Sequence, residues 1–70
     1  MVQIFCERLK ELRKEQGISQ PKLAEILGVS NGMISFWENG INEPTIGYVI
    51  KLSKIFEVST DYLLGLTDEY

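Results

Sequence analysis

The residues best suited to chemistry lie between Ser19 and Thr45, and most of them are hydrogen-bonding amides and hydroxyls. The 70-residue chain has no histidine and a single cysteine, which excludes a histidine-based catalytic triad, a cysteine–histidine zinc site and an internal disulfide. Neither a converging pair of carboxylates nor a glycine-rich phosphate loop is apparent. We therefore expect a binding protein rather than an enzyme, with no metal and no cofactor.

These side chains must be positioned by a small folded domain. Hydrophobic residues make up 44% of the chain, which is enough for one core. We expect residues 1–66 to form the domain and residues 67–70 to be a short acidic tail, with Leu66 to Tyr70 fraying because they carry no structural signal. No apolar run approaches the length of a membrane span, so a soluble, cytoplasmic protein with no membrane contact is expected.

Apolar residues recur at three- and four-residue steps through most of the chain, which predicts an all-α domain of five helices and no strand. The helices are expected at residues 3–16, 20–27, 31–38, from 46 to about 56, and 60–64. Serine, threonine and glycine stand where helices should begin and end. The expected N-caps are Ser19, Ser30, Thr45 and Ser59, and the expected stops are Gly17, Gly28, Gly40 and Gly65.

The third predicted helix has two distinct faces at about 100° per residue. Ile34 and Trp37 fall on one side, with Met33 and Glu38 at its edges. The opposite, outward face carries Asn31, Gly32, Ser35 and Phe36.

The motifs RLKELRKEQGISQ, LAEILGVS, ISFWENG, EPT and VSTDYLLG follow one another in a single order and spacing. From Phe5 to Gly65 the chain therefore resembles the Cro and phage-repressor type (XRE-like) of helix-turn-helix domain. The resemblance implies a compact five-helix, lambda-repressor-like domain whose second and third helices form the helix-turn-helix. It also implies sequence-specific binding of double-stranded DNA, usually by a homodimer, to control transcription, here as a repressor. The dimer could be weak and form mainly on DNA.

The outward face of the third helix would meet base edges in the major groove, and the resemblance places base-contacting positions there. The Asn31 amide can bond adenine bidentately, and the Phe36 ring can contact thymine methyl groups. Alternatively, Asn31 only helps to cap the helix, and Phe36 leans on the domain surface or enters a dimer contact. Gly32 departs from the family, in which a longer polar residue is commoner. It removes a side-chain contact and lets the backbone approach DNA. Ser35 completes the predicted base-contacting set.

Two stretches flanking this helix are expected to contact DNA phosphates. Gln20 and Lys22 lie at the start of the second helix, where free N–H groups and the positive dipole end favour an anion. The resemblance also gives the glutamine a second role, bracing the recognition helix, while Lys22 could serve solubility alone. Asn39, Asn42 and Thr45 follow the third helix and could bind phosphates or provide only turn and cap chemistry.

The resemblance further implies a structural ion pair between Arg13 and Glu38. The overall charge of −3 is opposite to that of most DNA-binding proteins. Residues 1–16 carry four basic and three acidic side chains, residues 17–40 one and two, and residues 41–70 two and five. A protein-binding helix-turn-helix module, such as an antitoxin with secondary DNA binding, is therefore the alternative hypothesis. Dimer contacts are expected around Tyr62, Leu64, Leu66 and the end of the fourth helix.

Overall fold

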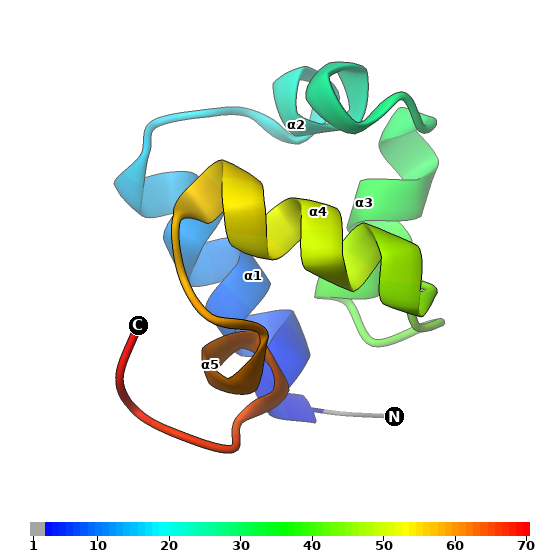
Figure 1. Cartoon of the computed structure of the whole chain (residues 1–70). Coiled ribbons are helices and arrows are strands. Elements are labelled where there is room, and N and C mark those ends of the chain that lie inside the picture. Colours follow the sequence, from blue (N-terminus) through cyan, green and yellow to red (C-terminus); the bar gives the residue numbers. More distant parts are fainter. Residues whose placement is uncertain (1–2) are drawn as a thin grey trace.

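Five helices make up most of the computed structural model, which describes residues 3–70. Met1 and Val2, the first residues of the predicted domain, lie outside the described residues. No strand occurs in residues 3–70, so the predicted all-α fold is confirmed. In chain order the helices are α1 (Gln3–Glu15), α2 (Gln20–Leu27), α3 (Asn31–Glu38), α4 (Ile46–Phe56) and α5 (Thr60–Leu64) (Figure 1).

Most helix boundaries follow the predicted capping chemistry. The hydroxyls of Ser19, Ser30 and Ser59 each accept a hydrogen bond from the backbone N–H three residues later. Thr45 occupies the N-cap position of α4, but its hydroxyl makes no such bond. At the other end of α4, Glu57 adopts the left-handed conformation with φ of 56°, although the sequence offers no glycine there.

Every helix contributes at least one fully buried side chain to the core. These residues are Leu9, Leu23, Ile34, Trp37, Leu52 and Leu63. α4 crosses over α1 in the middle of the domain, α2 lies at the top of the view and α3 at its right, and α5 packs near the start of α1 (Figure 1). This arrangement encloses the core with five short helices. It also leaves one side of α3 in solvent.

The C-terminal tail was expected to fray, but in the structure it contacts α1 and α5. Arg8 of α1 donates hydrogen bonds to the carbonyl oxygens of Tyr62 and, at 2.6 Å, of Thr67. Its guanidinium group also lies 4.1 Å from the centroid of the Tyr62 ring and bonds Asp68 at 2.8 Å. The Tyr70 and Tyr62 rings form a T-shaped pair, with the ring centroids 4.8 Å apart. The tail is therefore held against α1 and α5 by contacts that span almost the whole sequence.

None of the helices described in residues 3–70 is long and apolar enough to cross a lipid bilayer.

Candidate nucleic-acid interface

α2 and α3 are joined by a tight turn that sets their relative direction. Gly28 has a φ of 76°, a left-handed conformation that favours glycine, and the N–H groups of Gly28 and Val29 both bond the carbonyl oxygen of Ala24. Val29 packs against the core beneath the turn. Ser30 then starts α3 at once. The turn leaves α3 at the edge of the molecule (Figure 1).

The inner face of α3 is fixed by core packing. Ile34 and Trp37 are almost fully buried, as the helical periodicity predicts, and Met33 is partly buried against the core. The Trp37 ring lies 5.5 Å from the Tyr48 ring of α4, centroid to centroid. Because one face of α3 is fastened to both the core and α4, the helix cannot rotate about its own axis without breaking these contacts.

Arg13 and Glu38, the pair expected from the resemblance, join α1 to the end of α3. Arg13 donates from Nε to Glu38 Oε2 at 2.6 Å and from Nη2 to Oε1 at 3.1 Å. Its Nη1 donates to the carbonyl oxygen of Ile18 at 3.0 Å. The Glu38 side chain is 0% exposed and that of Arg13 is 12% exposed. The hydrogen bond with Glu38 raises the pKa of Arg13 above its usual range.

Gln20 adds the second helix to this network. Its Nε2 donates to Glu38 Oε1 at 3.1 Å, so one carboxylate is bonded by side chains from both α1 and α2. This contact agrees with the bracing role that the resemblance implies for the glutamine. A side-chain amide carries two N–H donors, and the second remains available for a phosphate oxygen. The proposed phosphate contact and the brace are therefore chemically compatible.

The outer face of α3 stands free of the core. Asn31 and Gly32 are exposed, Ser35 is partly buried, and the Phe36 side chain is in solvent with 43% exposure. The Met33 N–H bonds the Ser30 hydroxyl at 3.3 Å, so the cap is made by Ser30 and does not need Asn31. The structure thus brings all four predicted base-contacting residues onto one surface.

The predicted phosphate-contacting residues stand at the start of α2 and in the segment that follows α3. Lys22 is exposed at the start of α2, and its Nζ lies 3.9 Å from the Glu25 carboxylate. Asn42 and Thr45 are exposed in the segment between α3 and α4. Asn39 is different, because its Nδ2 donates to the Ser35 hydroxyl at 3.1 Å. That bond links the loop to the outer face of α3, a connection that the sequence did not indicate.

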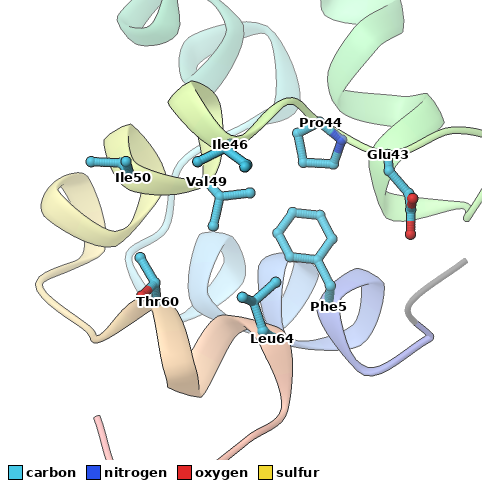
Figure 2. A pocket seen from close by; sticks show the side chains of 8 residues that line it. All are labelled: Phe5, Glu43, Pro44, Ile46, Val49, Ile50, Thr60 and Leu64. Carbon is cyan, nitrogen blue, oxygen red and sulfur yellow. The ribbon is translucent and has the colours of Figure 1, made fainter.

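An apolar groove that the sequence did not predict lies between α1, α4 and α5. Figure 2 shows Phe5, Val49 and Leu64 pointing toward its centre, with Pro44 at its border. Its volume is about 480 Å³. Ile46 and Ile50 line it and are 79% and 44% exposed, so the apolar stripe of α4 is wider than its buried part. Tyr62, one of the predicted dimer contacts, is buried and does not line this groove.

Comparison with known proteins gives matches over most of the chain. The family described as "Helix-turn-helix" matches residues 9–63. The chain is 33% identical to the Bacillus subtilis regulator YobD over 66 residues, which cover 94% of this chain and 59% of YobD. It is 42% identical to the Bacillus subtilis regulator ImmR over 59 residues, which cover 84% of this chain and 46% of ImmR. The chain thus spans about half the length of these two relatives.

Among solved structures, the P22 c2 repressor bound to a synthetic operator superposes with a TM-score of 0.80 and 40% identity. The match covers 86% of this chain and 91% of the repressor chain. The family match over residues 9–63 includes the turn between α2 and α3, most of the core residues and the Arg13–Glu38 pair. The chain therefore belongs to the helix-turn-helix family.

Proposed function

We propose that this chain is the sequence-specific, double-stranded-DNA-binding domain of a cytoplasmic transcriptional regulator that acts as a repressor. The observation that carries the proposal is the division of α3 into a face fixed by Trp37 and Glu38 and a free face bearing Asn31 and Ser35. A helix with its side chains is about 10–12 Å across, which matches the roughly 12 Å width of the major groove. The relative solved with its operator supports the same assignment.

In this proposal, two sets of residues that flank α3 in the sequence bind DNA phosphates beside the groove. Gln20 and Lys22 take one phosphate at the N-terminus of α2, and Asn42 and Thr45 take another from the following loop. Lys22 is the only basic residue between residues 17 and 40. In this proposal, neutral hydrogen-bond donors therefore make most of the phosphate contacts. This explains how an acidic domain can bind DNA with little positive charge. Asn39, the remaining predicted phosphate contact, acts in this scheme together with Ser35.

We also propose that two copies bind one operator. Twofold-related helix-turn-helix domains place their α3 copies about 34–36 Å apart on one face of DNA. The exposed apolar residues Ile46, Ile50, Leu64 and Leu66 offer a contact surface, and Glu43 and Pro44 connect it to the phosphate-binding loop. The surface is small, so the dimer should be weak in free solution and become populated on the operator.

The test is fluorescence anisotropy against a pool of labelled duplexes, followed by selection of the bound sequences and a salt series on the best one. We expect binding that weakens as salt rises, with Lys22→Ala reducing the slope of log K against log salt by about 1 per protomer. Lys54→Ala, near the end of α4 and away from α3, is the matched control and should leave the slope unchanged. Absence of binding at low salt, or binding without a salt dependence, would contradict the proposal.

The apolar groove and the net charge of −3 favour one second candidate, a module that binds a protein partner as an antitoxin does. A pull-down with the product of the neighbouring gene separates the two. If that protein binds tightly and Ile46→Asp in the groove abolishes the complex while no duplex is selected, the second candidate replaces the first.

A further inference from the structure

Two serines lie inside helices, Ser35 in α3 and Ser53 in α4, and their hydroxyl groups are used differently. Ser53 donates its proton to the carbonyl oxygen of Ile50 at 2.8 Å, which is an ordinary bond for a serine within a helix. Within residues 3–70 the Ser35 hydroxyl makes one hydrogen bond, in which it accepts from Asn39 Nδ2 at 3.1 Å. The proton of Ser35 therefore has no acceptor in the described part of the domain.

Asn39, which directly follows α3, bonds Ser35 twice. Its backbone N–H donates to the Ser35 carbonyl oxygen at 2.9 Å, in addition to the side-chain bond. Residues four apart are neighbours on a helix, and the Asn39 side chain leans back over the turn that contains Ser35. The N–H groups of Gly40 and Ile41 also bond carbonyl groups of α3, so the backbone ends the helix without the amide side chain. The side-chain bond therefore acts on Ser35 and is not needed to end the helix.

The bond from Asn39 decides the direction of the Ser35 hydroxyl group. A hydroxyl carries one proton and two lone pairs, and the amide N–H occupies a lone pair. The proton must point away from the amide hydrogen atoms, because their partial charges have the same sign. Ser35 is partly exposed and lies on the outer face of α3 between Asn31 and Asn39, at four-residue steps. Its proton is therefore presented to whatever meets that face, and Ser35 is a hydrogen-bond donor there.

In the major groove, the hydrogen-bond acceptors are the N7 atoms of both purines, the O6 of guanine and the O4 of thymine. O6 and O4 already accept a hydrogen bond within their base pair, whereas N7 has no partner in the duplex. We propose that Asn39 is a positioning residue that holds the Ser35 hydroxyl as a donor to the N7 of a purine. The inference rests on the proposed function, because it requires α3 to lie in the major groove, and it adds the atom that Ser35 recognises.

This contact separates purines from pyrimidines at one position of each half-site. It does not distinguish adenine from guanine, because both carry N7 at the same place. A serine whose proton is not fixed can donate or accept, and it would also tolerate the amino group of adenine or cytosine. Asn39 therefore adds selectivity without touching a base. The second N–H of its amide remains available for the phosphate contact predicted for Asn39, so the two roles need separate measurements.

The experiment uses the whole chain and the duplex that it selects from a random pool. Each purine is replaced in turn by its 7-deaza analogue, which has a C–H group in place of N7 and keeps its base pairing. We expect the dissociation constant to rise about three- to tenfold at one purine of each half-site, the effect of one neutral hydrogen bond. Ser35→Ala should bind the natural and the 7-deaza duplex equally at that purine, which separates it from any N7 that Asn31 contacts.

Two variants of Asn39 test its positioning role. Asn39→Ala frees the Ser35 proton to bond a carbonyl group of its own helix, as Ser53 does, so the 7-deaza penalty should fall to about twofold or less. Asn39→Asp is the sharper variant, because a carboxylate only accepts and the Ser35 proton then turns toward it. The 7-deaza penalty should vanish, although the added negative charge weakens binding to every duplex.

Asn42→Ala is the matched control. Asn42 is an exposed asparagine three residues further along the chain and is proposed to contact a phosphate only. Its replacement should weaken binding to the natural and 7-deaza duplexes by the same factor and leave the penalty unchanged. The Asn39 variants should unfold at nearly the same temperature as the wild type, since the side-chain bond that they lose is exposed to solvent.

If no purine shows a 7-deaza penalty that Ser35→Ala removes, the inference is wrong. A penalty that survives Asn39→Asp would overturn it too, because Ser35 would then donate without help from Asn39. In either case salt-dependent binding to the selected duplex would remain, and the proposed function would stand. If no duplex is selected at low salt, the proposed function fails and this inference fails with it.

Discussion

Two arginines of α1, Arg8 and Arg13, form ion pairs with residues far along the chain. The two pairs differ in how exposed the carboxylate is. Arg13 bonds Glu38, whose side chain is 0% exposed, whereas Arg8 bonds Asp68, which is 99% exposed. An ion pair in solvent contributes little because water and salt screen it, while a buried charge that loses its partner is strongly destabilising. Arg13 therefore fixes the proposed recognition helix α3, whereas the ion pair of Arg8 only attaches the C-terminal tail.

The remaining contacts of the two arginines sharpen this difference. Arg8 relies on two backbone carbonyl groups and on the face of the Tyr62 ring, so most of its contribution does not depend on Asp68. Arg13 relies on the carboxylate itself, with two of its nitrogens on the two oxygens of Glu38. Burial of the partner should decide which arginine matters more for stability and for DNA binding.

The largest effect is expected for Arg13→Ala. It leaves the Glu38 carboxylate buried with only Gln20 as a side-chain donor, and it should lower the free energy of unfolding by about 3–5 kcal/mol. Glu38→Ala should be milder, because the stranded Arg13 is partly exposed and can turn to solvent. Urea denaturation measures both values. In a double-mutant cycle the two changes should be strongly coupled. Additive losses below about 1 kcal/mol each would show that the pair is not the anchor of α3.

A smaller effect is expected for Arg8→Ala, about 1–2 kcal/mol, because it removes charge-assisted hydrogen bonds to carbonyl groups that water can then reach. Asp68→Ala is the matched control and should change stability by less than about 0.5 kcal/mol. DNA binding should be unaffected by either change. If Asp68→Ala destabilised the protein as much as Arg8→Ala, the exposed ion pair would be the main contact and the comparison would be wrong.

The smallest effect of the three concerns Gln20. Gln20→Ala removes one hydrogen bond to Glu38 but leaves Arg13 in place, so the loss of stability should be about 1 kcal/mol. Its loss of DNA affinity should be larger than this stability change explains, since the same amide is proposed to contact a phosphate. Lys22→Ala at the same helix end is the comparison for affinity alone. A Gln20→Ala variant that binds DNA like the wild type would restrict Gln20 to the bracing role.

The features of this fold that could be predicted are those encoded by neighbouring residues. Hydroxyl residues before apolar runs gave the caps at Ser19, Ser30 and Ser59, because each bond spans only three residues. The burial of Ile34 and Trp37, and the exposure of Phe36, followed from the period of the helix. The Arg13–Glu38 pair spans 25 residues and was expected only through the resemblance to a family.

Contacts between distant residues could not be predicted where the family resemblance did not imply them. The contacts of Arg8 have no signal in the sequence, because two of its partners are backbone carbonyl groups 54 and 59 residues away. The fraying expected for the tail was wrong for that reason. The exposure of Ile46 and the groove beside it depend on how far α5 lies from α4, which helical periodicity does not specify.

The most direct test of the central claim, that the outer face of α3 contacts DNA, is a map of backbone amide chemical-shift changes when the selected duplex is added to the whole chain. We expect the largest changes at the N-terminus of α2, along α3 and in the loop from Asn39 to Thr45, with little change in the tail held by Arg8. Changes confined to α5 and the groove around Ile50 and Leu64, with α3 unaffected, would contradict the account.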